Sequence, residues 1–101
     1  MDRYKFDWDP AKEKANIRKH GIDFDMAQTV FEDVNVIFKQ DRIVDGEERW
    51  QALGQTVDQT LIVVAHAVTH ENKDGTQLNV RLISARTPER WEREEYRSFY
   101  S

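Results

Sequence analysis

The fold of this chain is decided by one stretch, Thr60-Leu61-Ile62-Val63-Val64-Ala65-His66-Ala67-Val68-Thr69. Residues 61–65 are the longest apolar run of the chain, and their number suits a β-strand. Apolar side chains point to both faces at the centre, which is typical of a strand inside a sheet. The alternation places His66 on the same face as Ile62 and Val64. We therefore expect the other strands to be arranged around this segment.

Three further stretches are predicted to be strands. They cover residues 34–40, 48–55 and 77–86. Asp45-Gly46 and Asp74-Gly75 are typical turn sequences, and both stand in polar segments between these stretches. Because antiparallel neighbours need only short connections, the four strands are predicted to form an antiparallel meander.

A helix is predicted over residues 11–19. Asp9 is placed so that its side chain accepts hydrogen bonds from the free amides of the first turn. Pro10 suits the first helical position, where no amide donor is needed. Gly21 follows the helix and is expected to adopt the left-handed conformation that ends many helices.

Two more helices complete the predicted fold. Asp23 is placed to cap a second helix that ends near Asp33. Near the other end of the chain, Thr87 is placed to cap a helix that starts at Pro88. The predicted order is ααββββα, a single α+β domain over residues 1–101 with a four-stranded antiparallel sheet, two N-terminal helices and a C-terminal helix.

Charge is distributed unevenly along the chain, whose net charge is −4. Residues 1–21 carry +2 and residues 81–101 carry +1, whereas residues 22–80 carry −7. If the two ends meet in the fold, a basic site can form on an acidic protein. The acidic middle segment suits a partner that is itself basic, such as a DNA-binding protein.

The composition disfavours several classes of protein. The chain has no cysteine for disulfides or thiolate zinc sites, and it starts without the apolar run of a signal peptide or membrane span. No phosphate-binding glycine loop or dinucleotide fingerprint occurs. His66 and His70 would stand roughly 13 Å apart on one strand, too far for a shared zinc ion. We expect no metal, no cofactor, no membrane contact and a cytoplasmic location.

Three of the predicted strands each place one strong polar residue on a partly apolar face. These residues are Arg49, His66 and Arg81. In a meander the three faces can coincide, although alternation alone leaves the cross-strand register open. Two alternatives stay open as well. His66 is also typical of a hydrogen-bonded core histidine, and Arg81 and Arg86 can pair with carboxylates of the last helix.

Cations and a proton carrier are sufficient for RNA cleavage without a metal. The 2′-hydroxyl of RNA is itself the nucleophile, so the protein has to orient the chain, stabilise charge at phosphorus and move protons. The guanidinium of arginine is always protonated and matches phosphate geometry. His20 is another proton carrier, because the C-terminal end of a helix favours its protonated form, but a plain capping role explains it equally well.

Short motifs along nearly the whole chain resemble the BrnT family of bacterial toxins. The motifs are Trp8-Asp9-Pro10-x-Lys12, Asn16-Ile17-Arg18-Lys19-His20-Gly21-Ile22-x-Phe24, Val30-Phe31-Glu32-Asp33, Glu47-Glu48-Arg49-Trp50-x-x-x-Gly54, residues 61–66 and Arg81-Leu82-Ile83-Ser84-Ala85-Arg86. The resemblance implies a RelE-like fold and a type II toxin that cleaves RNA and arrests translation. It also implies a DNA-binding antitoxin of the BrnA kind, whose complex with the toxin represses their operon. The long polar hairpin over residues 70–77 departs from the family.

The resulting hypothesis is a ribonuclease toxin. Four residues are predicted to be catalytic, as phosphate contacts or proton carriers: Arg49, Arg81, His66 and His20. Lys19 and Arg86 are predicted to bind RNA, and DNA is reached only through the antitoxin complex. Two alternatives are a non-catalytic subunit that holds a DNA-binding partner, and a domain whose Arg–Glu pairs merely join the last helix to the sheet.

Overall fold

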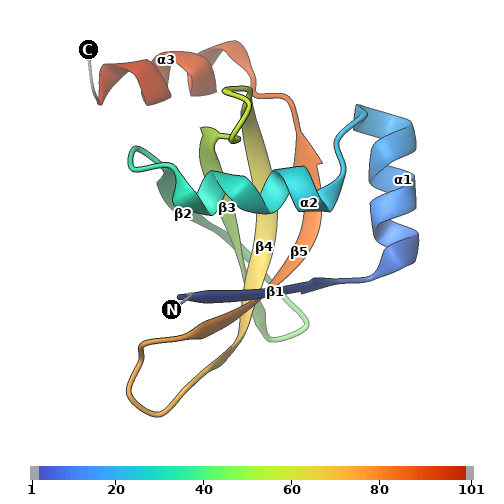
Figure 1. Ribbon diagram of the computed structural model, residues 1–101, viewed down its shortest axis with the longest axis vertical. Helices are drawn as coiled ribbons and strands as arrows, with labels where there is room; N and C mark the ends of the chain where they lie inside the picture. Colours follow the sequence, from blue (N-terminus) through green and yellow to red (C-terminus); the bar gives the residue numbers. More distant parts are fainter. Residues whose placement is uncertain (1–2, 100–101) are drawn as a thin grey trace.

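The computed structural model describes residues 3–99. Its elements are β1 (Tyr4–Trp8), α1 (Pro10–His20), α2 (Phe24–Ala27), the 3₁₀ helix η1 (Gln28–Glu32), β2 (Ile37–Val44), β3 (Glu47–Gln55), β4 (Leu61–Glu71), β5 (Leu78–Arg86) and α3 (Arg90–Ser98) (Figure 1). The strands form one sheet in the order β1-β5-β4-β3-β2, with β4 at its centre. Among the described residues, no helix is long and apolar enough to cross a membrane.

The prediction of an α+β fold is confirmed, but the predicted four-stranded antiparallel sheet is wrong, because a fifth strand joins it. β1 pairs in parallel with β5, so that Tyr4 lies opposite Leu78 and Trp8 opposite Leu82. β2, β3, β4 and β5 form the predicted antiparallel meander. The side chains of β1 alternate between half-buried and exposed, as in any edge strand, but the partner of β1 lies some 70 residues further along the chain.

Three predicted helix boundaries are confirmed. Asp9 caps α1 by accepting a hydrogen bond from the amide of Ala11 at 2.8 Å, and Asp23 caps α2 by accepting one from the amide of Met26 at 2.7 Å. Gly21 ends α1 in the left-handed conformation with a φ of 72°. Each cap and its helix are neighbours in the sequence, so the signal is local.

Two other boundaries differ from the prediction. The second helix ends near Asp33 as predicted, but its second half is the 3₁₀ helix η1. Thr87 is not the cap of α3, whose N-cap is Glu89. The carboxylate of Glu92 accepts a hydrogen bond from the amide of Glu89 at 2.7 Å. The capping box of Glu89 and Glu92 fixes the first turn at Arg90, so the helix begins two residues later than predicted.

The strand predicted over residues 34–40 starts later and runs further, as β2. Its pairing with β3 is irregular between Gln40 and Ile43 and then resumes to Val44. The predicted turn at Asp45-Gly46 follows, with φ values of 53° and 79°. The polar residues between Gln40 and the turn are therefore part of the strand, because a β-bulge carries the ladder across them.

The two faces of the sheet are packed differently. On one face, which we call the helix face, α2 and η1 cover the strands, and Phe24 and Val64 are fully buried there. On the other face, which we call the α3 face, Tyr96 packs against Leu53 and Val63. Figure 1 shows α2 crossing the strands while α3 lies at one end of them. The neighbours Val63 and Val64 belong to different clusters, because successive side chains of a strand point to opposite faces.

Asp33 connects the end of η1 to β3 and α3. One carboxylate oxygen accepts hydrogen bonds from the amide of Gln55 at 2.8 Å and from the hydroxyl of Tyr96, and the other accepts one from the amide of Asn35 at 2.9 Å. Burial raises the pKa of Asp33, but these hydrogen bonds outweigh burial and hold the pKa below its ordinary value. Gly54 suits this site, because a Cβ there would stand 3.2 Å from the Asp33 carboxylate.

Candidate functional site

Two arginines on the α3 face share one carboxylate. Arg81 donates from Nη2 to both carboxylate oxygens of Glu47, and Arg49 donates from Nε to Oε1 of the same residue at 3.3 Å. Hydrogen bonding and charge from Arg81, with a smaller contribution from Arg49, hold the pKa of Glu47 below its ordinary value. We call these three residues the Arg–Glu–Arg triad. Two guanidinium groups around one carboxylate leave an excess of positive charge there.

The sheet register places the two arginines on one face and His66 on the other. Arg81 lies opposite Ala67 of β4, whereas His66 lies opposite Leu82 of β5. Residues opposite one another in a ladder point to the same face, so His66 points to the helix face together with the buried Leu82. The prediction that Arg49 and Arg81 share a site is supported by the triad, but the placement of His66 beside them is wrong.

A single extra residue in β5 explains why His66 is separated from Arg81, whereas Arg49 is separated from it by alternation alone, because His66 lies opposite Trp50. The pairing of β4 with β5 shifts between Ala65 and His66, and Ile83 is left without a partner in the ladder. In an uninterrupted ladder, His66 would lie opposite Ile83, on the same face as Arg81. A slip of one residue turns every later side chain to the other face, and this bulge therefore separates the histidine from the arginine.

His66 is a core residue in this structure. It is 3% exposed, and its ring meets those of Phe31 and Phe38 with centroids 4.9 Å and 6.0 Å apart. Nδ1 lies 3.2 Å from the carbonyl oxygen of Val64, and because a carbonyl only accepts, Nδ1 carries the proton. Burial lowers the pKa of His66, and this hydrogen bond offsets the effect only in part, so the ring is neutral at pH 7. The alternative of a hydrogen-bonded core histidine agrees with these surroundings.

Arg86 joins α3 to the sheet. Its Nη1 and Nη2 donate to the two carboxylate oxygens of Glu92 at 2.8 and 3.0 Å. Burial raises the pKa of Glu92, which is 3% exposed, but Arg86 and the amide of Glu89 outweigh burial and lower it. Hydrogen bonding to Glu92 in turn raises the pKa of Arg86. The alternative in which an arginine pairs with the last helix therefore holds for Arg86, whereas Arg81 pairs with β3.

Two charged residues of the α3 face were not predicted as site residues from the sequence: Lys39 and Glu47. Nζ of Lys39 pairs with Glu95 of α3 at 2.5 Å and lies 5.2 Å from the ring centre of Trp91. The spacing of Glu47 and Arg49 was the available signal, because residues two apart on a strand share a face. No sequence spacing indicates a role for Lys39, because its contacts are residues of α3, far away in the sequence.

The two basic ends of the chain meet at the edge of the sheet. α1 packs beside the end of β5, where Oδ1 of Asn16 accepts a hydrogen bond from the amide of Ala85 at 3.0 Å. A pocket of about 420 Å³ lies between these elements. Basic and small side chains of both elements line this α1–β5 pocket: Lys12, Lys19, His20, Ser84 and Arg86. The structure thus brings the predicted RNA-binding residues Lys19 and Arg86 together with His20.

The chemical groups on this side of the sheet are cations and carboxylates, with His20 at the edge. Within residues 3–99, no three histidine or acidic side chains are grouped as ligands of a metal ion. Guanidinium and ammonium groups of this kind suit the binding of phosphate and the stabilisation of charge that develops on it.

A family model described as "Ribonuclease toxin, BrnT, of type II toxin-antitoxin system" matches residues 8–92. The chain belongs to this family. The crystal structure of the ribonuclease toxin BrnT of Brucella abortus is similar, with a TM-score of 0.61 and 22% sequence identity over 88% of this chain and 100% of that chain. At this identity the likeness concerns the fold. No curated protein matches the chain in sequence.

The BrnT-family match confirms the resemblance seen in the sequence motifs and shows how much of the site it includes. The matched residues contain the complete Arg–Glu–Arg triad and all residues of the α1–β5 pocket. They end at Glu92, the partner of Arg86. Both candidate sites therefore lie within the region that defines the family.

Proposed function

We propose that this protein is a toxin that cleaves RNA without a metal ion and arrests translation, and that a DNA-binding antitoxin of the BrnA kind neutralises it. The observation that supports this proposal is the Arg–Glu–Arg triad on the α3 face of a BrnT-family chain. The Arg81 side chain is 40% exposed, so a polynucleotide can reach it. Because RNA is a cytoplasmic substrate, we propose a cytoplasmic location.

The triad suits the binding of a phosphate that undergoes attack. Glu47 engages Nη2 of Arg81 and Nε of Arg49, and within residues 3–99 the other guanidinium donors of both arginines have no protein acceptor. These donors are available for the non-bridging oxygens of a phosphate. Charge stabilisation of this kind contributes about 3–4 kcal/mol to transition-state binding in other enzymes.

The proposed reaction is attack by the RNA on itself. The 2′-oxygen of one ribose bonds to the adjacent phosphorus, and the bond from phosphorus to the 5′-oxygen of the next nucleotide breaks. One proton leaves the 2′-hydroxyl and one is delivered to the 5′-oxygen, which yields a cyclic phosphate and a free 5′-hydroxyl. Neither predicted proton carrier lies at the triad: His20 lines the α1–β5 pocket, and His66 is buried on the helix face. In this proposal the two protons are therefore exchanged with water at the triad, and His20 contacts RNA in the α1–β5 pocket.

We further propose that RNA continues from the triad along β5 to the α1–β5 pocket. Arg81 and Arg86 stand five residues apart on β5, which corresponds to roughly 15 Å along the strand. Lys12 and Lys19 have no carboxylate partner within the described residues, whereas Arg86 is held by Glu92. The lysines therefore supply most of the free charge of this pocket, and Arg86 also holds α3.

The antitoxin is proposed to be a basic, DNA-binding protein. Residues 22–80 carry a charge of −7, which suits a basic partner better than it suits RNA. DNA would be contacted by the antitoxin, and the toxin would reach the operator only as part of the complex.

The substitution Arg81→Ala tests the proposal. The purified wild-type chain is expected to cleave an RNA oligonucleotide in the presence of EDTA, and Arg81→Ala is expected to lower the rate about 100- to 1,000-fold. The variant should keep the melting temperature and bind the antitoxin, and its expression should no longer arrest growth. Arg90→Ala is the matched control, because the Arg90 side chain is 93% exposed. Cleavage by Arg81→Ala at the wild-type rate would remove this arginine from the site, and loss of wild-type cleavage in EDTA would contradict metal independence.

One observation favours a second candidate, the non-catalytic subunit of a regulatory complex. Among the described residues, four cations on the α3 face are each already paired with a carboxylate: Lys39, Arg49, Arg81 and Arg86. In that case the folded wild-type chain would bind the antitoxin and leave RNA intact under every buffer condition.

A further inference from the structure

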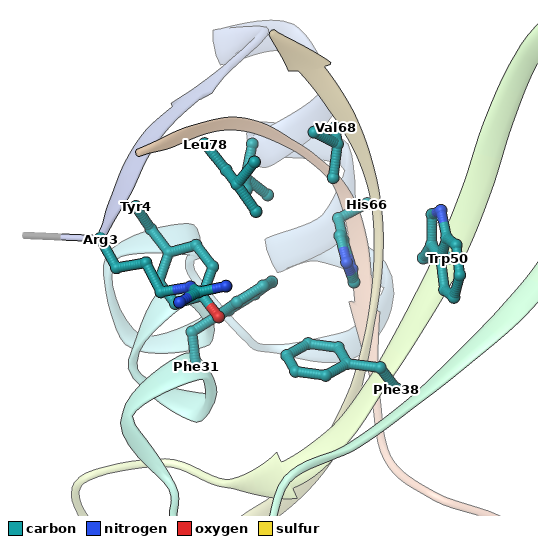
Figure 2. A pocket seen from close by; sticks show the side chains of 9 residues that line it. Arg3, Tyr4, Phe31, Phe38, Trp50, His66, Val68 and Leu78 are labelled. Atoms are coloured by element: carbon teal, nitrogen blue, oxygen red, sulfur yellow. The ribbon is translucent and has the colours of Figure 1, made fainter. Parts of the chain in front are cut away.

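A second pocket lies on the helix face, on the opposite side of the sheet from the triad (Figure 2). Its volume is about 270 Å³. Four aromatic rings, an imidazole and a guanidinium form most of its wall: Tyr4, Phe31, Phe38, Trp50, His66 and Arg3. We call it the aromatic pocket. None of these side chains takes part in the proposed handling of RNA.

His66 presents a hydrogen-bond acceptor to the aromatic pocket. Because Nδ1 donates to the carbonyl of Val64, Nε2 of the neutral ring is the acceptor, and it has no partner within residues 3–99. Figure 2 shows the imidazole pointing into the space between the aromatic rings. This nitrogen opens into the pocket and is not enclosed, because it is not among the enclosed side-chain atoms of the described residues that lack a partner. A ligand that brings an N–H or O–H group can therefore donate to it.

Arg3 supplies a cation at the same pocket. Its guanidinium carbon lies 5.9 Å from the ring centre of Tyr4, and no carboxylate of the described residues pairs with it. Figure 2 shows the Arg3 side chain extending in front of Tyr4. An anionic group next to the ring of a ligand would therefore meet a free positive charge.

Apolar side chains continue outward from the aromatic pocket. Phe38 and Val68 line it and are each 41% exposed, and Ile43, further along β2, is 64% exposed. A small polar ligand leaves such a rim in water, whereas a protein segment covers it. The rim therefore favours a protein as the source of the ligand.

We propose that the aromatic pocket binds a tryptophan side chain of a partner protein, with a carboxylate close to that tryptophan. The indole ring is apolar and its N–H only donates, so it complements both the rings and Nε2 of His66. The carboxylate complements Arg3. A nucleobase is less suitable, because it carries several donors and acceptors that this mainly apolar wall leaves unpaired. Identifying the partner as the antitoxin rests on the proposed function, but the chemistry of the pocket does not.

Indole-3-acetate, which combines an indole N–H with a carboxylate, is the probe of the pocket itself. We expect binding with a Kd of about 1 mM, as for other ligands of this size, followed by NMR through the indole signal of Trp50. The probe 1-methylindole-3-acetate lacks the N–H and should bind about fivefold more weakly. In His66→Phe, which keeps the ring and removes the acceptor, the two probes should bind equally.

Two further experiments test whether Arg3 supplies the positive charge of the pocket and whether a nucleotide is the preferred ligand. Arg3→Gln should weaken indole-3-acetate about threefold or more while leaving plain indole unchanged. Adenosine and uridine monophosphate should bind more weakly than indole-3-acetate. Equal binding of both indole probes to the wild-type chain would overturn the assignment of the acceptor without any variant, and tighter binding of a nucleotide would overturn the assignment of the ligand.

The protein arm uses the complete chain co-expressed with its antitoxin. Val68→Glu places a charge on the rim and should lower the recovery of the complex at least tenfold, whereas Thr69→Glu, at the exposed neighbouring position, should leave it unchanged. Unchanged recovery with Val68→Glu would overturn the identification of the partner. A chain that fails to cleave RNA but discriminates between the two indole probes would separate a failure of the proposed function from a failure of this inference.

Discussion

The helix face and the α3 face of the sheet are built on the same strands, yet they are chemically opposite. On the helix face, side chains such as Val64 and Leu82 are fully buried beneath Phe24 and its neighbours. On the α3 face, the same strands carry Arg49 and Arg81 around Glu47. A strand alternates its side chains, so one segment can supply a core and a charged surface at once. The comparison indicates that one face contributes most of the stability and the other contributes the chemistry.

The charged face is nevertheless ordered by its own contacts. Glu92 and Glu95 of α3 pair with Arg86 and Lys39 of the sheet. Exposed ion pairs contribute little, but a carboxylate as buried as Glu92 has to keep its partner. The position of α3 over the sheet therefore depends on polar contacts more than the positions of α2 and η1 do.

The largest expected effect comes from breaking the helix face. Phe24→Ala removes a ring that is fully buried and should lower the free energy of unfolding by about 3–5 kcal/mol through lost burial and a cavity. Urea denaturation measures it. Phe99→Ala, which removes a ring that is 69% exposed, is the control and should change stability by less than about 0.5 kcal/mol. Equal losses in the free energy of unfolding for the two variants would contradict the conclusion that the helix face contributes most of the stability.

A smaller effect is expected at Asp33, which joins the two faces. Asp33→Asn keeps the shape but replaces one acceptor oxygen by a donor opposite the Gln55 amide and the Tyr96 hydroxyl, at a cost of about 1–3 kcal/mol at pH 7. The exposed Asp25→Asn is the control. Chemical denaturation of the three proteins measures the difference, and a loss equal to that of the control would show that the junction is not important.

The same pair of variants tests the pH dependence. The folded-state pKa of Asp33 is lowered, so its stabilisation is complete above the unfolded pKa near 3.9 and is lost as the pH falls through the folded value. The folded-state pKa of Glu92 is also lowered, so its contribution to stability is lost in the same direction, as the pH falls. The wild-type chain should lose stability between about pH 5 and pH 2, and the loss should be smaller in Asp33→Asn. Parallel curves for the two proteins would contradict the lowered pKa of Asp33.

The smallest effect is expected at the outer surface of α3. Arg90 and Glu94 form a pair four residues apart, with side chains 93% and 63% exposed. Arg90→Ala should change the free energy of unfolding by no more than about 0.5 kcal/mol, and 0.5 M salt should remove even this difference. A loss above 1 kcal/mol would mean that Arg90 has a contact beyond this pair.

Much of the fold can be predicted from short segments. Asp9, Gly21 and Asp23 mark their helix ends because each cap acts on amides or carbonyls a few residues away. The turn at Asp45-Gly46 is local in the same sense. Thr87 fails as a cap because the choice between Thr87 and Glu89 depends on where Glu92 and its partner Arg86 settle.

The candidate site, too, can be predicted from the sequence only in part. Arg49 and Arg81 are recognised because a strand alternates, and the chain ends are recognised as basic by counting charges. The face on which Arg81 lies relative to His66 depends on one unpaired residue, Ile83, whose position follows from pairing between strands. Lys39 is recognised only once α3 has docked beside it.

The sequence by itself determined the helix ends at Asp9, Gly21 and Asp23, the tight turns, the central strand and the family of this protein. Tertiary structure decided that β1 joins β5, that His66 faces the core and that the two arginines meet at Glu47. Caps and turns are set by hydrogen bonds between near neighbours, so a short segment contains both partners. Strand pairing and ion pairs join residues tens of positions apart, and the free energy that selects among registers comes from packing of the whole chain.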